Sequence, residues 1–427
     1  MSVAQFLDPA GLRFDIVVMD EASQIRPEDA LGAIVRGGQL VVVGDPKQLP
    51  PTTFFEKVDR DDLPDDNAEE ADIHDLTSQE SILDLARGPY QPVRQLRWHY
   101  RSQHESLIAF SNHEFYDDRL IVFPSPRGKD LEYGVRLVSV EGIYEAGLNR
   151  AEAEAITGAA QEFMQQFPTR SLGIVAMNKP QQELIQKMMD ELFATNVEAE
   201  AYRLRWENSL DAIFVKNLEN VQGDERDVIF ISTVYGKDVA GNFFQRLGPI
   251  NGAHGHRRLN VLFTRAKQQV RLFTSMKAND IRIEPTSRWD VKALKNYLSY
   301  AQSGHLESNE ITGREPDSEF ERWVMEMLQE SGYETVPQLG VAGYFIDIAV
   351  RHPQRRGAFI LGIECDGAMY HSARSVRDRD RLRQEVLERL NWNIYRIWST
   401  DWFRNPRAEF QKLTSALETL RVSSILQ

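Results

Sequence analysis

Two polar segments near the start of the chain follow apolar runs and carry residues that could handle a nucleotide. DEASQ (20–24) comes directly after FDIVVM, and GDPKQLPPT (44–52) comes directly after QLVVV. In a parallel α/β sheet, functional groups gather at the carboxyl ends of the strands. At such an edge Asp20 could hold Mg²⁺, Glu21 could orient or deprotonate an attacking water, and Gln48 could reach a γ-phosphate. The two segments together predict a phosphate-handling site.

A second set of acids lies in the last quarter of the chain. Asp347 interrupts the apolar run YFIDIAV (344–350), while Glu364 and Asp366 stand near the end of AFILGIECDG (358–367). Alternation along a strand points Glu364 and Asp366 to the same side. With Asp347 on the neighbouring strand, the three carboxylates could converge on one or two Mg²⁺ ions. Such a site activates water and stabilises the leaving oxygen in phosphodiester cleavage.

The elements that must position these side chains alternate between apolar runs and helical patterns. Further strands are expected at 171–177, 227–233 and 270–275, with a helix at 149–167. This rhythm is typical of a parallel α/β sheet. The order of the patterns predicts four segments: part of a first α/β domain (1–94, with an acidic insertion at 59–75), a second α/β domain (95–280), a polar linker (281–315) and a C-terminal α/β domain (316–427).

Composition limits the classes to which the protein can belong. The 427 residues suffice for two or three domains, and no apolar run is long enough to predict a membrane span. One cysteine, Cys365, excludes an internal disulfide, and the N-terminus lacks a secretory pattern, so a cytoplasmic location is expected. The net charge of −14 argues at first against a nucleic-acid partner, but nine of the acids lie within residues 59–75.

Five motifs in fixed order carry a specific resemblance. DEASQ, GDPKQLPPT, LRWHYRS, VQGDERDVIF and RRLNVLFTRAK resemble motifs II to VI of superfamily 1 helicases, in the branch of the nonsense-mediated-decay and replication-associated helicases. The match covers about residues 14–275. The resemblance implies a RecA-like motor that uses ATP and moves on DNA or RNA. It also implies that Arg101 and Arg265 are arginine fingers, which stabilise charge on the γ-phosphate during transfer.

Further nucleotide contacts are implied by the same resemblance for Gln48, Gln181, Gly223 and Glu225. One departure is AMNKPQQ (176–182), where Asn178 stands in the position of the aromatic residue that stacks on adenine in the family. Glu225 is expected near the ribose or near a finger arginine. Asn260 is expected to have a structural role beside the strand next to Arg265, the candidate finger of the same motif.

The chain has no GxxxxGK[ST] stretch, the loop that cradles nucleotide phosphates. In the family this loop precedes the DEASQ motif, and only nineteen residues precede Asp20 here. We therefore expect the upstream half of the first motor domain to come from the same longer protein or from a separate chain. ATP is then a cofactor only together with that half, and this polypeptide alone is expected to have no appreciable ATPase activity.

The C-terminal acids resemble those of the PD-(D/E)xK nuclease fold, although the usual lysine is absent. The segment DGAMYH (366–371) and the later NWNIYRIW are similar to the very short patch repair endonuclease and its relatives. This resemblance implies that His371 is a general base or water positioner and that Arg383 replaces the lysine charge. Arg379 and Arg383, on one face of a helix, are expected to meet phosphates. Glu319 on the opening helix is expected as a further acid, and Gln338 precedes the strand that carries Asp347.

Two hypotheses of different classes follow. The first is a fragment of an ATP-dependent DNA helicase fused to a Mg²⁺-dependent endonuclease that serves DNA processing, repair or anti-phage defence. The second is a catalytically inactive nucleic-acid-binding or regulatory module. Cleavage of DNA in the presence of a divalent metal separates them.

Overall fold

A computed structural model describes residues 11–51, 81–127, 132–252, 254–304, 306, 315–340, 344–366 and 374–425. The acidic insertion expected at 59–75 lies outside these ranges, so the expectation for it stays a prediction. No helix within the described ranges has the length and apolar character that a membrane span requires.

The N-terminal part contains a small parallel sheet. Strands β1 (Phe14–Met19) and β2 (Gly37–Val42) pair in parallel, beside η1 (Ala22–Gln24), α2 (Pro27–Ile34) and α5 (Ile82–Arg87). Every second residue of β1 is exposed: Phe14 at 42%, Ile16 at 54% and Val18 at 62%. The other side of the sheet packs Met19, Ala22 and Ala30 together. One apolar face of β1 is therefore uncovered by the described residues.

The central unit is a five-stranded, wholly parallel sheet in the order β5-β9-β8-β6-β7. Its strands are β5 (Gly134–Ser139), β6 (Leu172–Ala176), β7 (Phe214–Asn217), β8 (Arg226–Ser232) and β9 (Ala266–Thr274). Strand β6, LGIVA, is buried along its whole length. Continuous apolar strands are typical of a parallel sheet covered on both faces. The α/β class expected from the sequence is confirmed.

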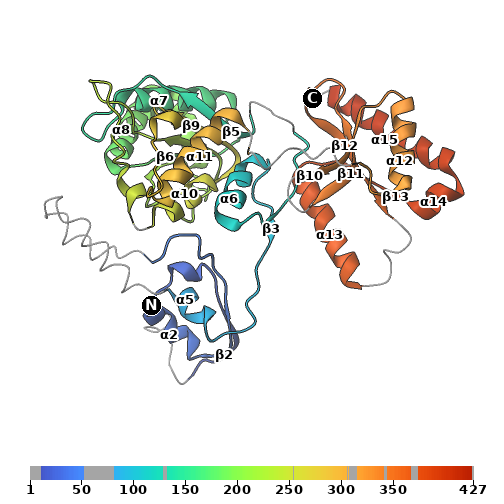
Figure 1. Ribbon diagram of the computed structural model, residues 1–427, viewed down its shortest axis with the longest axis horizontal. Helices are drawn as coiled ribbons and strands as arrows, with labels where there is room; N and C mark the ends of the chain where they lie inside the picture. Colours follow the sequence, from blue (N-terminus) through green and yellow to red (C-terminus); the bar gives the residue numbers. More distant parts are fainter. Residues whose placement is uncertain are drawn as a thin grey trace.

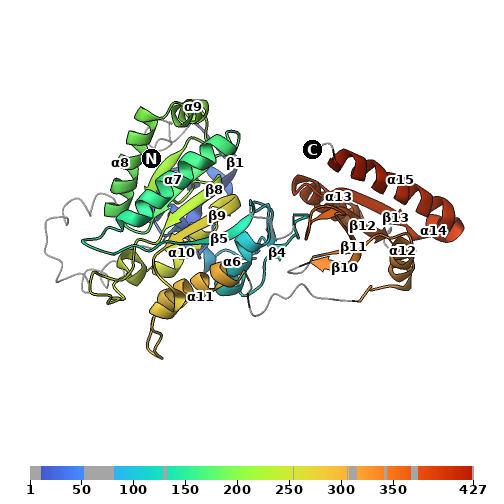
Figure 2. The ribbon, with the colours of Figure 1, turned by 90° about the horizontal axis from the view of Figure 1, so that it is seen from above.

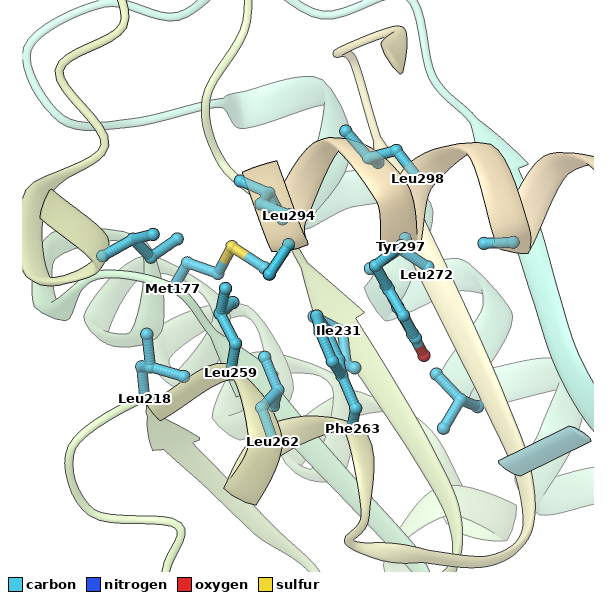
Figure 3. Close-up of a cluster of buried hydrophobic side chains, with 14 of the residues drawn as sticks. Met177, Leu218, Ile231, Leu259, Leu262, Phe263, Leu272, Leu294, Tyr297 and Leu298 are labelled. Carbon is cyan, nitrogen blue, oxygen red and sulfur yellow. The ribbon is translucent and has the colours of Figure 1, made fainter. Parts of the chain in front are cut away.

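Helices cover both faces of this sheet (Figure 1). One face carries α7 (Arg150–Gln166), α8 (Lys179–Thr195) and α9 (Val197–Trp206), and the other carries α6 (Ser106–Tyr116), α10 (Gly255–Phe263) and α11 (Trp289–Ser303). The turns η3 (Gly248–Asn251) and η4 (Ala278–Asp280) lie on the second side. Figure 3 shows the core under α10 and α11, where the Phe263 and Tyr297 rings stack with centroids 3.4 Å apart.

Helix α11 corrects the linker expected at 281–315. Its residues Val291, Leu294, Tyr297 and Leu298 are buried in the core of the central unit. These positions recur at the helical spacing of three and four residues, so the helix covers the sheet with one apolar stripe. The expectation of a linker is wrong for residues 289–303, because the Gly, Ser, Asn and Pro residues that suggested it lie after the helix.

The C-terminal unit is a mixed four-stranded sheet with helices on it (Figure 1). Its elements are β10 (Thr335–Gly340), β11 (Phe345–Arg351), β12 (Phe359–Asp366), β13 (Ile394–Trp398), α12 (Glu319–Glu330), α13 (Arg374–Arg389), α14 (Ser399–Arg404) and α15 (Pro406–Ile425). Strands β10, β11 and β12 are antiparallel neighbours, and β13 runs parallel to β12. Trp402, Val324 and Leu413 fill the core between sheet and helices.

A short connecting sheet joins the central and C-terminal units. Strands β3 (Trp98–His99) and β4 (Ile121–Val122) pair in parallel. Figure 2 shows β4 between α6 and the C-terminal sheet. The backbone N–H of Phe359 on β12 donates to the Pro126 carbonyl (2.8 Å), which fixes this stretch against the C-terminal unit.

Candidate nucleotide and nuclease sites

Asp20 and Glu21 follow β1 at its carboxyl end. Glu21 has a left-handed backbone (φ 51°), and its N–H donates to Asp20 Oδ1 at 2.9 Å. The Gln24 amide donates to Glu21 Oε2 at 3.2 Å. Both acids are exposed. The sharp turn therefore presents two carboxylates at the edge where the sequence predicted a phosphate and its metal ion.

The loop after β2 is joined to the central unit by a hydrogen-bonded bridge. The Tyr116 hydroxyl donates to Asp45 Oδ2 at 2.6 Å and accepts from the Asn260 amide at 2.8 Å. The same amide donates to the Lys47 carbonyl at 3.1 Å. Asn260 thus has the structural role expected for it. Gln48, on this loop, accepts a long hydrogen bond (3.5 Å) from Gln222, which brings two of the expected motifs face to face.

Arg101 and Glu225 form an ion pair at the junction of the two motor parts, with 2.8 Å between Nε and Oε2. Lys267 contacts the other carboxylate oxygen at 3.2 Å. Partial burial alone would raise the pKa of Glu225. The positive charges of Arg101 and Lys267 outweigh burial, so the pKa is lowered overall. Gly223 precedes it with φ +86°, a conformation that suits glycine. Glu225 therefore binds Arg101, a candidate arginine finger. Proximity to a finger arginine is one of the two positions expected for Glu225.

Arg265 is buried, with only 3% of the residue exposed. Its Nε donates to the Val261 carbonyl at 2.9 Å. Burial and repulsion from Arg101 lower its pKa to about 10, while the negative charges of Glu21 and Glu225 oppose that shift. The charges of Arg101 and of Glu21, which follows the end of β1, therefore both act on Arg265 across the junction. Such a junction is where a γ-phosphate would be surrounded by positive charge.

The C-terminal site is centred on two acids of adjacent strands, β11 and β12. Asp347 Oδ2 accepts the backbone N–H of Cys365 at 2.7 Å, and Glu364 Oε1 accepts the Tyr344 hydroxyl at 2.7 Å. Burial and the negative charge of Glu364 raise the pKa of Asp347 to about 7. Burial also raises the pKa of Glu364. A divalent cation between two such carboxylates would relieve their mutual repulsion.

Asp366 behaves differently from these two acids. Its Oδ2 lies 3.0 Å from Nε of Arg396 on β13, which runs parallel to β12. Within the ranges that the structure describes, no three His, Cys, Asp or Glu side chains are grouped to hold a metal ion. The expected three-carboxylate centre of Asp347, Glu364 and Asp366 is therefore not preformed. The pair Asp347 and Glu364 is the part of it that the geometry supports.

Three matches with known families cover most of the chain. Residues 2–56 and residues 78–277 each match an AAA domain family model, and residues 320–417 match the REase_MTES_1575 model. An uncharacterized ATP-dependent helicase of Mycoplasma pneumoniae, the MG140 homolog, is 29% identical over 416 residues. Residues 2–277 are thus similar to helicase sequences, and residues 320–417 are similar to a restriction-endonuclease-like domain. The aligned region covers 95% of this chain, so that relative resembles both the motor and the nuclease-like domain.

Other relatives agree with this assignment. The uncharacterized ATP-dependent helicase MG140 of Mycoplasma genitalium is 29% identical over 424 residues, and helicase sen1 of Schizosaccharomyces pombe is 24% identical over 286 residues. The alignments cover 95% and 62% of this chain and 37% and 15% of those proteins. The chain thus spans 37% of the length of its Mycoplasma relatives.

The solved structure of the PRRSV helicase is 14% identical and covers 64% of this chain and 37% of that chain, with a TM-score of 0.28. So low a TM-score supports no conclusion about the fold. The motor fold follows instead from the parallel strand order and the two AAA domain matches.

Gln181 has a different role in the motor from the nucleotide contact expected for it. It is fully buried, its amide donates to the Asn149 carbonyl (2.8 Å) and to Ser232 Oγ (3.2 Å), and its oxygen accepts the Asn149 N–H (2.9 Å). Every polar atom of the side chain is used within the protein. Gln181 therefore holds the start of α7, and Asn178 caps α8 through its bond to the Gln181 N–H (2.9 Å).

The nuclease-like domain contains two residues that sequence reasoning missed. Glu321, not Glu319, is buried at 6% exposure, and its carboxylate accepts the Gln338 amide at 2.8 Å. Its negative charge contributes to the raised pKa of Asp347. Glu319 is exposed on the other side of α12. The second is Arg396, whose charge opposes the rise in the pKa of Glu364.

The remaining predicted residues of this domain are placed only in part. His371 lies outside the described residues, and Arg379 belongs to α13 with an undescribed side chain. Arg383 lies with its guanidinium carbon 5.4 Å from the centre of the Tyr344 ring. Its positive charge also acts on Glu364 and opposes the rise in the pKa of that acid. Arg383 therefore lies close enough to act on Glu364. A residue that replaces the lysine of the PD-(D/E)xK fold would need such a position.

Proposed function

We propose that the chain is part of an ATP-dependent helicase–nuclease that acts on DNA in a cytoplasmic setting, with catalysis of phosphodiester cleavage in the C-terminal domain. The observation that carries the proposal is the pair of half-buried acids Asp347 and Glu364, on adjacent strands of a restriction-endonuclease-like domain. The helicase relatives and the fused nuclease-like domain favour this hypothesis over an inactive regulatory module.

The donor chemistry of the acid pair fits a hard divalent cation. Asp347 and Glu364 offer carboxylate oxygens, which Mg²⁺ prefers, and the paired strands β11 and β12 hold the two acids near each other. The raised pKa of Asp347 reflects burial together with the negative charge of Glu364. When bound, Mg²⁺ would supply a water of lowered pKa and stabilise charge on the leaving oxygen.

The protein groups have separate tasks in this proposal. The Cys365 N–H and the Tyr344 hydroxyl each fix one carboxylate oxygen, which orients the other oxygens of Asp347 and Glu364 toward a cation. Arg383 and Arg396 supply positive charge near Glu364, where the family has a lysine. His371 is proposed to position or deprotonate the water, and Arg379 to contact a phosphate. Asp366 would take part only after its ion pair with Arg396 opens.

Nicking of supercoiled plasmid DNA by the purified chain in Mg²⁺ or Mn²⁺ tests this activity. We expect the wild type to nick and Glu364→Gln to lose at least about 100-fold in rate, since several kcal/mol of charge stabilisation depend on the bound cation. Glu409→Gln, a change of the same chemistry on α15, is the matched control and should nick normally. Equal nicking by wild type and Glu364→Gln would contradict the proposal.

The motor residues are proposed to act on ATP only with an upstream segment that carries the phosphate-binding loop. Asp20 would bind Mg²⁺, Glu21 would orient water, Gln48 would contact the γ-phosphate, and Arg101 and Arg265 would stabilise its charge. Two observations support a covering segment: the exposed apolar face of β1 and the greater length of the relatives.

The chain alone is therefore expected to turn over no ATP above background. Phosphate release by the purified chain, in the presence and absence of single-stranded DNA, is the measurement. ATP turnover that Glu21→Gln abolishes would show that this chain suffices for hydrolysis, and the need for an upstream segment would be refuted.

A further inference from the structure

A stretch of the motor sequence is built into the core of the nuclease-like domain. Phe123 lies within the AAA domain match (78–277), yet it is 3% exposed and packs in one cluster with Leu339, Tyr344 and Trp392. The Trp392 indole N–H donates to the Pro124 carbonyl at 2.8 Å. The domain recognised as the nuclease by its sequence therefore does not contain all of its own core.

Phe123 reaches an acid of the candidate site through one intermediate residue. Its ring and the Tyr344 ring have centroids 4.7 Å apart, with 40° between their planes. The Tyr344 hydroxyl donates to Glu364 Oε1 at 2.7 Å. The Arg383 guanidinium lies 5.4 Å from the Tyr344 ring centre. The position of the hydroxyl, and with it that of the Glu364 carboxylate, depends on the packing of the Tyr344 ring.

The same stretch is also anchored to the motor. The Ile121 N–H donates to the Arg97 carbonyl at 2.7 Å, and the Ser125 N–H donates to Glu105 Oε2 at 2.9 Å. The Trp98 ring meets the Phe123 ring edge-on at 5.7 Å. Trp98 lies on β3, three residues before the finger candidate Arg101. The segment is thus held at both ends, by the motor and by the nuclease-like domain.

We propose that Tyr344 is a positioning residue for Glu364 in metal-dependent cleavage, and that Phe123 of the motor holds Tyr344 in place. This inference rests on the proposed nuclease function. A divalent cation binds only when its carboxylate ligands are accurately positioned. The residues that hydrogen-bond to these ligands or pack against them fix that position. Without the hydroxyl, Glu364 loses the bond that selects its rotamer. Without the Phe123 ring, Tyr344 borders an empty volume and gains freedom to turn.

The test measures two quantities on the full chain: the Mn²⁺ concentration that gives half-maximal plasmid nicking, and Mn²⁺ binding by electron paramagnetic resonance. Tyr344→Phe should raise the half-saturating concentration about tenfold, the factor that one hydrogen bond is worth. Phe123→Ala should raise it by a similar factor, and Phe123→Leu, which keeps most of the apolar volume, should restore part of the loss.

The matched control is Tyr333→Phe, which removes a hydroxyl that donates to Glu418 at 2.8 Å in the same domain. This variant should keep the half-saturating Mn²⁺ concentration of the wild type. Simple loss of folded protein would lower the maximal rate and leave that concentration unchanged. The split between maximal rate and half-saturation therefore separates positioning from a general structural role.

Two results would overturn the inference in different ways. If the wild type binds Mn²⁺ and nicks, and both Tyr344→Phe and Phe123→Ala show an unchanged or lower half-saturating concentration, the positioning role is refuted while the nuclease function stands. If the wild type neither binds Mn²⁺ nor nicks, the nuclease function and the inference fail together.

Discussion

The substitution Asp347→Asn tests the electrostatics of the C-terminal site through protein stability. Burial and the Glu364 charge raise the pKa of Asp347 from 3.8 to about 7. A carboxyl group with a raised pKa in the folded state favours folding while it is protonated. Its contribution is therefore complete below about pH 4 and is lost as the pH rises through about 7.

The size of this effect follows from the pKa difference. About three pKa units correspond to roughly 4 kcal/mol, at about 1.4 kcal/mol per unit. Asp347 is only partly buried by exposed area, so screening by water reduces this, and we expect on the order of 2 kcal/mol. The amide that Asp347→Asn introduces carries no charge, yet its oxygen can still accept the Cys365 N–H. Asp347→Asn should therefore be the more stable protein near pH 8 by about 2 kcal/mol, and equal to the wild type near pH 4.

Urea unfolding followed by tryptophan fluorescence, at pH values from about 4 to about 8, measures this difference. Four of the seven tryptophans lie in the C-terminal domain, so the signal reports mainly on it: Trp323, Trp392, Trp398 and Trp402. Asp401→Asn, at an exposed acid of the same domain, is the control and should follow the wild type at every pH. If Asp347→Asn and the wild type lose stability in parallel as the pH rises, the reasoning is refuted.

Two further predictions concern other buried groups. Glu152 is fully buried and accepts hydrogen bonds from the backbone N–H groups of Val234 and Ser275 (2.9 and 2.7 Å). Glu152→Gln would turn an amide toward such donors and should destabilise the motor by about 1–3 kcal/mol in thermal unfolding, whereas an unchanged unfolding temperature would contradict this. A Cβ at Gly340 would collide with the Tyr344 carbonyl oxygen. Gly340→Ala should therefore destabilise the nuclease-like domain by about 1–3 kcal/mol, and wild-type tryptophan unfolding curves would argue against it.

The sequence predicted the strands well because a covered parallel sheet leaves a continuous apolar signal. The run 171–177 contains β6 (Leu172–Ala176), and 227–233 contains most of β8 (Arg226–Ser232). Carboxylates within or just after such runs are placed by the strands themselves. The sequence could therefore place Asp20 at the end of β1 and Asp347 on β11.

Errors arose where one helix face had to be chosen. Glu319 and Glu321 lie two residues apart, which places them on different sides of α12. Val324 and Leu328, three and seven residues after Glu321, are buried, so Glu321 shares the apolar face. That signal was present in the sequence. The partner of Asp366 was not predictable, since it depends on the parallel register that sets Asp366 beside Trp398 and places Arg396 within reach.

Contacts between distant segments were also beyond sequence reasoning. Phe123 and Tyr344 are separated by more than half the chain, and no local pattern indicates that they meet. Gln181 was assigned to a nucleotide from its place in a motif, whereas its contacts with Asn149 and Ser232 arise from the packing of α7 on the sheet. Motif order thus predicts which residues gather, and packing decides which of them keep free polar atoms.

The initial rate of plasmid nicking at Mn²⁺ concentrations far below half-saturation, where the metal-free site sets the pH profile, tests the central claim most directly. We predict that the wild-type rate rises with pH through about 7, as Asp347 loses its proton, and that Asp347→Asn is slower by at least about 100-fold across the range. An Asp347→Asn protein that nicks at the wild-type rate, with the wild-type pH profile, would contradict the assignment of a nuclease site to these acids.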